Sequence, residues 1–123
     1  MLQKLRPFIL ISFLSANAFG EDLLSLPNWI NPADVSGTYR CKRGATTSEF
    51  TIDTVSKTMR QTANSEVMSG FYNTIRRNID TNNEIFFFTV ERAYAEGLGF
   101  GKDGKFYSPS LEGDEAFDSC SKS

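Results

Sequence analysis

The chain contains no histidine and only two cysteines, Cys41 and Cys120. Histidine is the most common general base and zinc ligand, so its absence excludes Ser-His-Asp and Cys-His catalysis and a tetrahedral Cys/His zinc site within one chain. If the two cysteines pair, no thiol nucleophile remains. We therefore predict a protein that is not an enzyme and holds no metal or cofactor, although a carboxylate pair or a lysine–serine arrangement stays open.

The chain also lacks any apolar run of the roughly 20 residues that a membrane span requires, so we predict no transmembrane segment. Residues 1–20 instead have the pattern of a secretory signal peptide. Lys4 and Arg6 precede a short apolar run, and small residues then offer cleavage after Ala18 or after Gly20. This order predicts a secreted or periplasmic protein in an oxidising compartment.

A strong net charge is absent as well. The formal net charge is −2, and removing Lys4 and Arg6 with the signal leaves 11 basic against 15 acidic residues, or −4. Nucleic acids and anionic lipids both select basic surfaces, so we expect neither as a partner. The acidic residues near the C-terminus lack the spacing of a calcium loop and predict a solvated loop; they are Glu112, Asp114, Glu115 and Asp118.

No helical periodicity longer than about two turns is present, and alternation of polar and apolar residues dominates instead. Residues 21–36 predict an irregular lead-in segment with about one helical turn, in which Trp29 packs over one end of the domain. Residues 37–123 predict a β domain. Its expected strands cover residues 38–42, 49–53, 57–61, 70–79, 84–94, 97–101, 105–108 and 116–121.

Three local patterns position these strands. The run Ile85–Val90 is apolar on both faces and predicts a central strand, because an exposed edge of this kind would aggregate. Glycine alternates from Gly97 to Gly101, which predicts a bent or bulged strand with close backbone approach rather than a nucleotide loop. Residues Asp80–Asn83 and the pair Asp103-Gly104 predict hairpin turns, whereas the polar stretch Thr62–Ser69 predicts a longer loop.

Together these patterns predict an all-β fold. Seven or eight short antiparallel strands form a meander that becomes a closed or nearly closed barrel, with a sandwich as the alternative. In a closed meander the first and last strands are neighbours, and Cys41 and Cys120 lie on those two strands. We therefore predict a Cys41–Cys120 disulfide that joins the two ends of the sheet.

Two short segments, Tyr39–Cys41 and Ser69–Tyr72, resemble parts of the small periplasmic inhibitors of C-type lysozyme. Those inhibitors are disulfide-tied barrels that often begin with Tyr-x-Cys and carry a Ser-Gly-x-x-Tyr loop; here the tyrosine comes one position earlier. The resemblance implies a partner-binding loop made of Ser69, Gly70, Phe71 and Tyr72. The start Asp34–Tyr39 also resembles the first strand of a lipocalin.

A small disulfide-linked domain that lacks the common catalytic residue types is typical of a protein that acts by binding. We expect a protein partner, for example a secreted enzyme that the domain inhibits. The first alternative is a carrier of a small apolar ligand in a calycin-like barrel, and the second is an envelope protein without catalytic activity. A further candidate is an anion patch formed across a hairpin by Arg76, Arg77 and Arg92.

Overall fold

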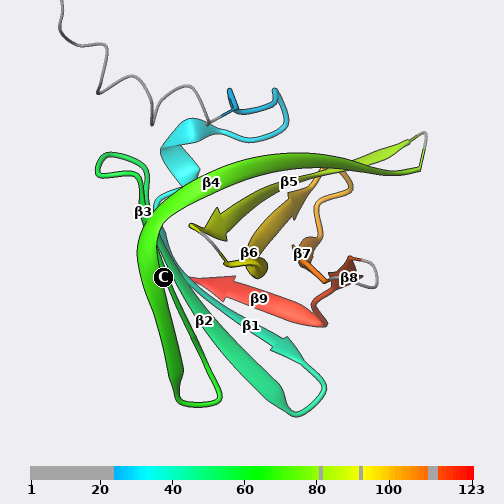
Figure 1. Cartoon of the computed structure of the whole chain (residues 1–123). Coiled ribbons are helices and arrows are strands. Elements are labelled where there is room, and N and C mark those ends of the chain that lie inside the picture. Colours follow the sequence, from blue (N-terminus) through cyan, green and yellow to red (C-terminus); the bar gives the residue numbers. More distant parts are fainter. Residues whose placement is uncertain (1–23, 81, 92, 111–113) are drawn as a thin grey trace, which may run out of the picture.

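The computed structural model of the chain describes residues 24–80, 82–91, 93–110 and 114–123 (Figure 1). Its described residues form nine strands in one antiparallel sheet of order β8-β7-β6-β5-β4-β3-β2-β1-β9. The strands are β1 (Gly37–Arg43), β2 (Thr46–Asp53), β3 (Thr58–Ala63), β4 (Glu66–Asp80), β5 (Asn83–Val90), β6 (Ala93–Gly101), β7 (Phe106–Ser108), β8 (Glu115–Ala116) and β9 (Ser119–Lys122). The predicted all-β meander is confirmed, and one continuous curled sheet favours the barrel over the sandwich.

The first strands follow the predicted alternation. Tyr39 and Cys41 of β1, Phe50 and Ile52 of β2 and Met59 of β3 are buried, and most of the residues between them are exposed. Side chains on a strand alternate between the two faces of the sheet, so these residues line the interior of the barrel. A three-residue 3₁₀ helix, η2 (Pro32–Asp34), precedes β1. In the described part of the chain no helix has the length and apolar character that crossing a bilayer needs.

Strand β4 is longer than predicted and bends the sheet. Its first half pairs with β3, from Ala63↔Glu66 to Thr58↔Phe71, and its second half pairs with β5, starting at Tyr72↔Val90. The long curved strand in Figure 1 therefore connects two halves of the sheet that face each other. The halves enclose the main core, in which Phe50, Phe86 and Phe88 are each at most 1% exposed.

The predicted loop over Thr62–Ser69 is wrong. β3 runs to Ala63, β4 begins at Glu66, and a two-residue turn of Asn64 and Ser65 joins them, with φ values of 50° and 68°. Two left-handed residues match the twist of a tight hairpin. The turn and the start of β4 are exposed, and the two apolar residues Val67 and Met68 are adjacent, so the sequence shows no clear alternation here.

A second boundary also differs. The strand predicted over residues 84–94 ends at Val90, and β6 begins at Ala93. The central position of this strand is confirmed, because every residue from Ile85 to Val90 is buried and β5 is the fourth strand in the sheet order. Phe86 and Phe88 enter the main core, whereas Ile85 and Phe87 form a smaller cluster on the outer face.

The outer cluster is covered by the C-terminal part of the chain. Tyr107 and Ala116 pack on Ile85 and Phe87, and the guanidinium of Arg77 lies 5.2 Å from the centre of the Phe87 ring. Arg77 also donates to the Asp114 carboxylate at 2.5 Å. β5 is thus covered on both faces, which protects a strand that would otherwise favour aggregation.

The glycines of β6 permit this close packing. The register of β5 and β6 shifts between Thr89 and Val90, next to Gly97, which confirms the predicted bulge. A Cβ atom on Gly97 would lie 2.2 Å from the Phe88 carbonyl oxygen, and one on Gly99 would lie 2.5 Å from Cε1 of Phe87. Side chains larger than hydrogen therefore cannot enter at either position without movement.

The C-terminal residues join the two ends of the sheet. Phe117 N–H donates to the Phe106 carbonyl at 2.9 Å, and the next residue, Asp118, donates to the Lys42 carbonyl at 2.7 Å. The predicted last strand is therefore divided into β8, which pairs with β7, and β9, which pairs with β1. This division accounts for nine strands where we predicted at most eight.

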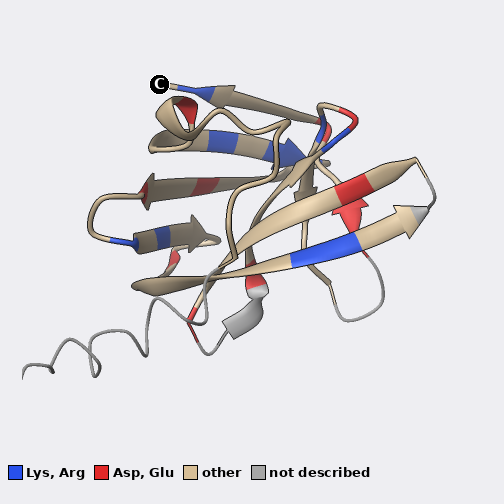
Figure 2. Cartoon of the chain, turned by 90° about the horizontal axis from the view of Figure 1, so that it is seen from above, with Lys and Arg blue, Asp and Glu red and all other residues tan. Residues whose placement is uncertain are grey.

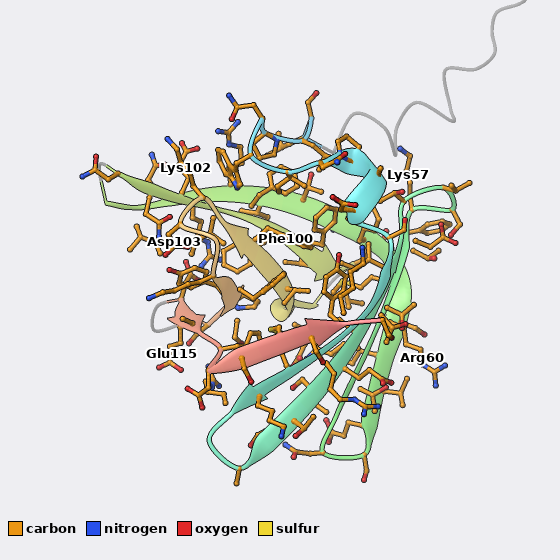
Figure 3. The ribbon with its side chains drawn as sticks, turned by 180° about the vertical axis from the view of Figure 1, so that it is seen from behind. Lys57, Arg60, Phe100, Lys102, Asp103 and Glu115 are labelled. Carbon is orange, nitrogen blue, oxygen red and sulfur yellow. A yellow bond between two sulfur atoms is a disulfide. The ribbon has the colours of Figure 1, made fainter. Side chains whose placement is uncertain are left out.

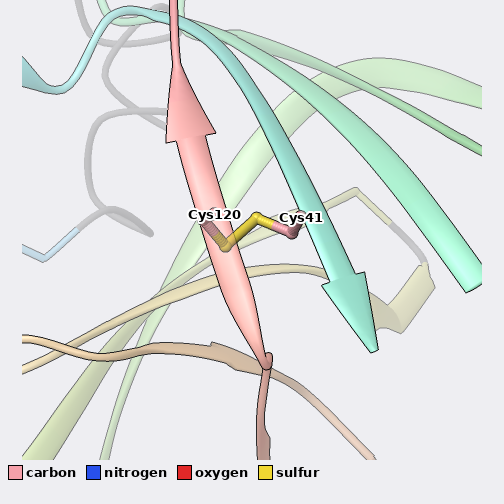
Figure 4. The surroundings of a disulfide bond; sticks show 2 residues. All are labelled: Cys41 and Cys120. Carbon is pink, nitrogen blue, oxygen red and sulfur yellow. A yellow bond between two sulfur atoms is a disulfide. The ribbon is translucent and has the colours of Figure 1, made fainter. Parts of the chain in front are cut away.

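The predicted disulfide is confirmed. Cys41 and Cys120 are direct partners in the β1–β9 ladder, with Cα atoms 4.0 Å apart, and their sulfur atoms are bonded (Figure 4). A closely spaced pair of this kind matches the non-hydrogen-bonded position of an antiparallel ladder. The bond closes a sequence separation of 79 residues.

Replacing both cysteines with alanine should lower the free energy of unfolding by about 4.5 kcal/mol, because the unfolded chain regains the entropy of a long open loop. Equilibrium unfolding in urea measures the change. Reductant should weaken the wild-type protein by a similar amount and leave the double variant unchanged. Equal urea midpoints for the double variant and the oxidised wild-type protein would contradict the structural role of the bond.

Gly99→Ala should lower the free energy of unfolding by about 1–3 kcal/mol, because the added methyl group would overlap the side chains of Phe87 and Ile85. The matched control is Ser69→Ala at an exposed strand position, which should change it by less than about 0.5 kcal/mol. Urea unfolding of both variants checks the prediction, and equal stabilities would refute the tight fit at Gly99.

Candidate functional site

The lead-in segment, residues 24–36, crosses one end of the barrel (Figure 1). Residues of this segment help to line a cavity of about 450 Å³. We call it the aromatic pocket. Its apolar lining consists of Trp29, Ile30, Val35, Tyr39, Phe100 and Phe106. Its rim carries Asp34, Lys105 and Lys122, all exposed, so the pocket opens to solvent over a mostly buried floor.

Three rings form the floor of the aromatic pocket. The ring centres of Tyr39 and Phe100 are 5.6 Å apart, those of Tyr39 and Phe106 are 5.7 Å apart, and those of Phe100 and Phe106 are 5.3 Å apart. These separations lie in the range in which tilted and edge-to-face aromatic pairs attract. Phe100 points into the barrel beneath the lead-in segment because its flanking glycines take the outward positions of β6 (Figure 3).

The lead-in segment forms one wall and is held at several points. Leu24 N–H donates to the Thr74 hydroxyl at 2.6 Å, and the Trp29 indole N–H donates to the Phe100 carbonyl at 3.4 Å. The Tyr39 hydroxyl lies 2.5 Å from the Val35 carbonyl oxygen and 3.0 Å from that of Asp34. Trp29 therefore packs over one end of the barrel, as the sequence predicts.

Burial changes the acidity of Tyr39. The loss of solvent around its ring, with a smaller contribution from the charge of Asp34, raises the Tyr39 pKa to about 12. The phenol accordingly stays protonated at neutral pH and remains a donor to the lead-in carbonyls. Tyr39 thus connects the floor of the pocket to its wall.

The rim carries charge of both signs. Lys122 donates from its ammonium group to the Asp34 carbonyl, and the same nitrogen lies 5.5 Å from the centre of the Tyr39 ring. Lys105 follows the β6–β7 turn. Among the described residues no group of three or more His, Cys, Asp or Glu side chains could hold a metal ion. The pocket itself offers an apolar floor with Asp34, Lys105 and Lys122 at its mouth.

A second cavity of about 420 Å³ is more polar. Gln61 and Glu96 line it, with the Gln61 amide donating to the Glu96 carboxylate at 2.6 Å. Ser48 and Ser108 add hydroxyl groups to its lining. The aromatic pocket is the better candidate for a ligand, because it combines apolar walls with few polar groups.

The predicted partner-binding residues lie in a strand. Ser69, Gly70, Phe71 and Tyr72 belong to β4, not to a loop. Tyr72 is 7% exposed and packs edge to face on Phe88, with ring centres 5.0 Å apart. Ser69 and Phe71 are exposed on the outer face. The structure thus separates the tyrosine from the residues with which it was predicted to act.

The two described members of the predicted anion patch, Arg76 and Arg77, do not lie together. Arg76 and Arg77 are consecutive in β4 and point to opposite faces of the sheet. Arg76 lies over Trp29 and pairs with Glu84 at 2.7 Å, whereas Arg77 pairs with Asp114. Arg92, the third predicted member, lies outside the described residues.

The acidic C-terminal residues have structural partners. Glu115 pairs with Arg43 at 2.6 Å, and Asp118 accepts from the Gly44 N–H at 2.8 Å. Asp114 pairs with Arg77, and Glu112 lies outside the described residues. More generally, basic and acidic positions are interleaved over the sheet (Figure 2). The ion pairs of Asp114 and Glu115 hold the C-terminal segment to the barrel.

Sequence reasoning did not identify the aromatic pocket. Tyr39, Phe100 and Phe106 belong to different predicted strands, and nothing in their spacing placed them together. The lysines of the rim come from β9 and from the turn after β6. Only closure of the barrel brings these segments next to residues 29–35.

Comparison with known proteins adds no relative. No protein-family model, no curated protein and no solved structure matches the chain. An all-β barrel hosts many unrelated functions, so the fold alone does not specify one. Function is therefore inferred from the geometry of this chain.

Tyr39→Phe should lower the free energy of unfolding at neutral pH by about 1 kcal/mol through loss of the hydroxyl contacts. The phenol's native-state stabilisation is complete below its unfolded pKa of 10 and is lost as pH rises toward about 12. The difference in free energy of unfolding between the wild-type protein and Tyr39→Phe should therefore become smaller above about pH 10, as measured by urea unfolding. Burial also raises the pKa of Tyr72, so the pH dependence of the wild-type protein alone does not report on Tyr39. If the difference in free energy of unfolding between the two proteins stays constant up to pH 12, the prediction is wrong.

Proposed function

We propose that the protein binds a small, largely apolar ligand in the aromatic pocket. The observation that carries this proposal is a cavity of about 450 Å³ with a floor of three mutually packed rings. Ligand sites in proteins are typically concave, predominantly apolar and of about 300–1,000 Å³, with a few polar groups that orient the ligand. Both the volume and the lining meet this description.

The walls of the pocket are fixed before a ligand arrives. Tyr39 and Lys122 are direct partners in the β1–β9 ladder, two positions from the Cys41–Cys120 bond. The lead-in wall is tied to the same ladder through the Tyr39 hydroxyl and the Lys122 ammonium. A preformed site loses little conformational entropy on binding, which favours affinity.

We also propose that binding takes place in a secreted or periplasmic setting, without catalysis. The disulfide supports this location, because such bonds persist in oxidising compartments. The signal-peptide pattern of residues 1–20 is the second support, and it lies outside the described residues. The absence of histidine from the sequence supports a binding role over an enzymatic one.

A protein partner is the second candidate function. Val67 and Phe71 are each 50% exposed and lie on the same outer face of β4, four residues apart. Exposed apolar side chains that share one face of a strand favour contact with another protein. An inhibitor acting through this surface would use Ser69 and Phe71 but not the buried Tyr72.

Intrinsic fluorescence tests ligand binding, because Trp29 is the one tryptophan of the chain and lines the pocket. Titration with an apolar probe such as 1-anilinonaphthalene should change Trp29 emission with saturation at one equivalent. Phe100→Ala should weaken probe binding about tenfold, because a core ring of the floor is lost.

Phe117→Ala is the matched control. Phe117 is also a partly buried phenylalanine packed on the main core, but it lines the second cavity instead of the aromatic pocket. This variant should lose comparable stability in urea and keep wild-type probe affinity. Equal loss of affinity in both variants, or no saturable binding by the wild-type protein, would refute the proposal.

A further inference from the structure

We infer that the ligand of the aromatic pocket is an amphipathic monoanion, with an apolar body on the aromatic floor and a carboxylate head at Lys105 and Lys122. This inference rests on the proposed function and specifies its ligand class. It comes from the distribution of charge around the pocket mouth. The apolar lining by itself does not distinguish a neutral ligand from a charged one.

Four ion pairs join described residues to one another, and an arginine makes each of them. The carboxylate partners are Glu49 for Arg40, Glu115 for Arg43, Glu84 for Arg76 and Asp114 for Arg77. Lys105 and Lys122 are exposed, and neither has a described carboxylate within 4.0 Å. Two lysines that form no ion pair with a described carboxylate thus lie at the mouth of one pocket.

Two further carboxylates, Asp103 and Glu84, lie near the pocket mouth. Asp103 accepts from the Tyr107 hydroxyl at 2.5 Å and from Lys105 N–H at 3.0 Å. Asp103 keeps its negative charge, because these donors are neutral, and that charge acts on Lys105. Glu84 pairs with Arg76, whose guanidinium lies 5.5 Å from the centre of the Trp29 ring. The remaining acidic group of the rim is Asp34. Lys102, Lys105 and Lys122 therefore stand against Asp34 and Asp103, which leaves one positive charge that a monoanionic head would neutralise.

The cationic group of Lys102 lies beside the tryptophan wall. The Lys102 ammonium is 6.0 Å from the centre of the Trp29 ring, within the range of a cation–π contact. Lys102 is exposed and lies in the same turn as Asp103, at the end of the barrel that the lead-in segment covers (Figure 3). Positive potential at a pocket mouth with low-dielectric walls attracts anions from solution. The acidic head group of a ligand can therefore reach the lysines while the apolar body of the ligand stays on the floor of the aromatic pocket.

Three probes that share a ten-carbon chain test the inference: decanoate, decanol and decylammonium, each titrated into the full mature protein with Trp29 emission as readout. At low salt, wild-type protein should bind decanoate about five- to tenfold more tightly than decanol, and decylammonium more weakly than either. The preference for decanoate should shrink at high ionic strength, because salt screens the lysine charges.

Lys105→Gln should reduce decanoate affinity about fivefold and leave decanol affinity unchanged. Lys42→Gln is the matched control, because Lys42 is an exposed lysine of β1 that does not line the pocket. Lys122→Gln should act like Lys105→Gln, and urea unfolding reports whether loss of its contact to Asp34 changes stability.

The outcomes separate the two levels of the proposal. The inferred anionic head group is wrong if decanol binds saturably and decanoate binds no more tightly to the wild-type protein. It is also wrong if Lys105→Gln does not change the preference for decanoate over decanol. In both cases the proposal of an apolar ligand pocket is retained. Tighter binding of decylammonium would also overturn the head-group assignment. If none of the three probes binds, the proposed function fails together with the inference.

Discussion

Pairing of the first strand with the last is the constraint on which the rest of the structure depends. The sheet begins at β1 and ends, after seven further strands, with β9 beside it, and the Cys41–Cys120 bond fixes their register. A small domain has a limited core, and a covalent link between its ends compensates for that limit. Without this pairing, β1 would present an open edge.

The aromatic pocket is a direct result of the same closure. β1 contributes Tyr39, β9 contributes Lys122, and the β6–β7 hairpin contributes Phe100 and Lys105. These segments meet because the meander returns to its starting strand. The other end of the barrel has a polar cavity, so the two ends of one scaffold offer different chemistry. The chemistry at each end is therefore set by the residues at the strand ends and in the connecting segments, while the core is common to both ends.

Alternating residues made much of the fold predictable, and the failures have physical causes. Tyr39 and Cys41 show a clear apolar face, so β1 and the disulfide followed from sequence. The Asn64 and Ser65 turn was missed because the residues around it are mostly polar and exposed, and they show no clear alternation. Adjacent arginines, Arg76 and Arg77, were grouped although a strand must point them apart. The pocket was not predictable, since the segments that line it are joined only by long-range contacts.

The late position of β8 and β9 also affects the order of assembly. A chain delivered from its N-terminus presents β1 to β7 first, with the Cys41 thiol unpaired and both sheet edges open. Contacts across a separation of 79 residues are entropically slow to form, and open edges are the sites where misassembly begins. The barrel therefore cannot close covalently until the last strand of the chain is available to pair with β1.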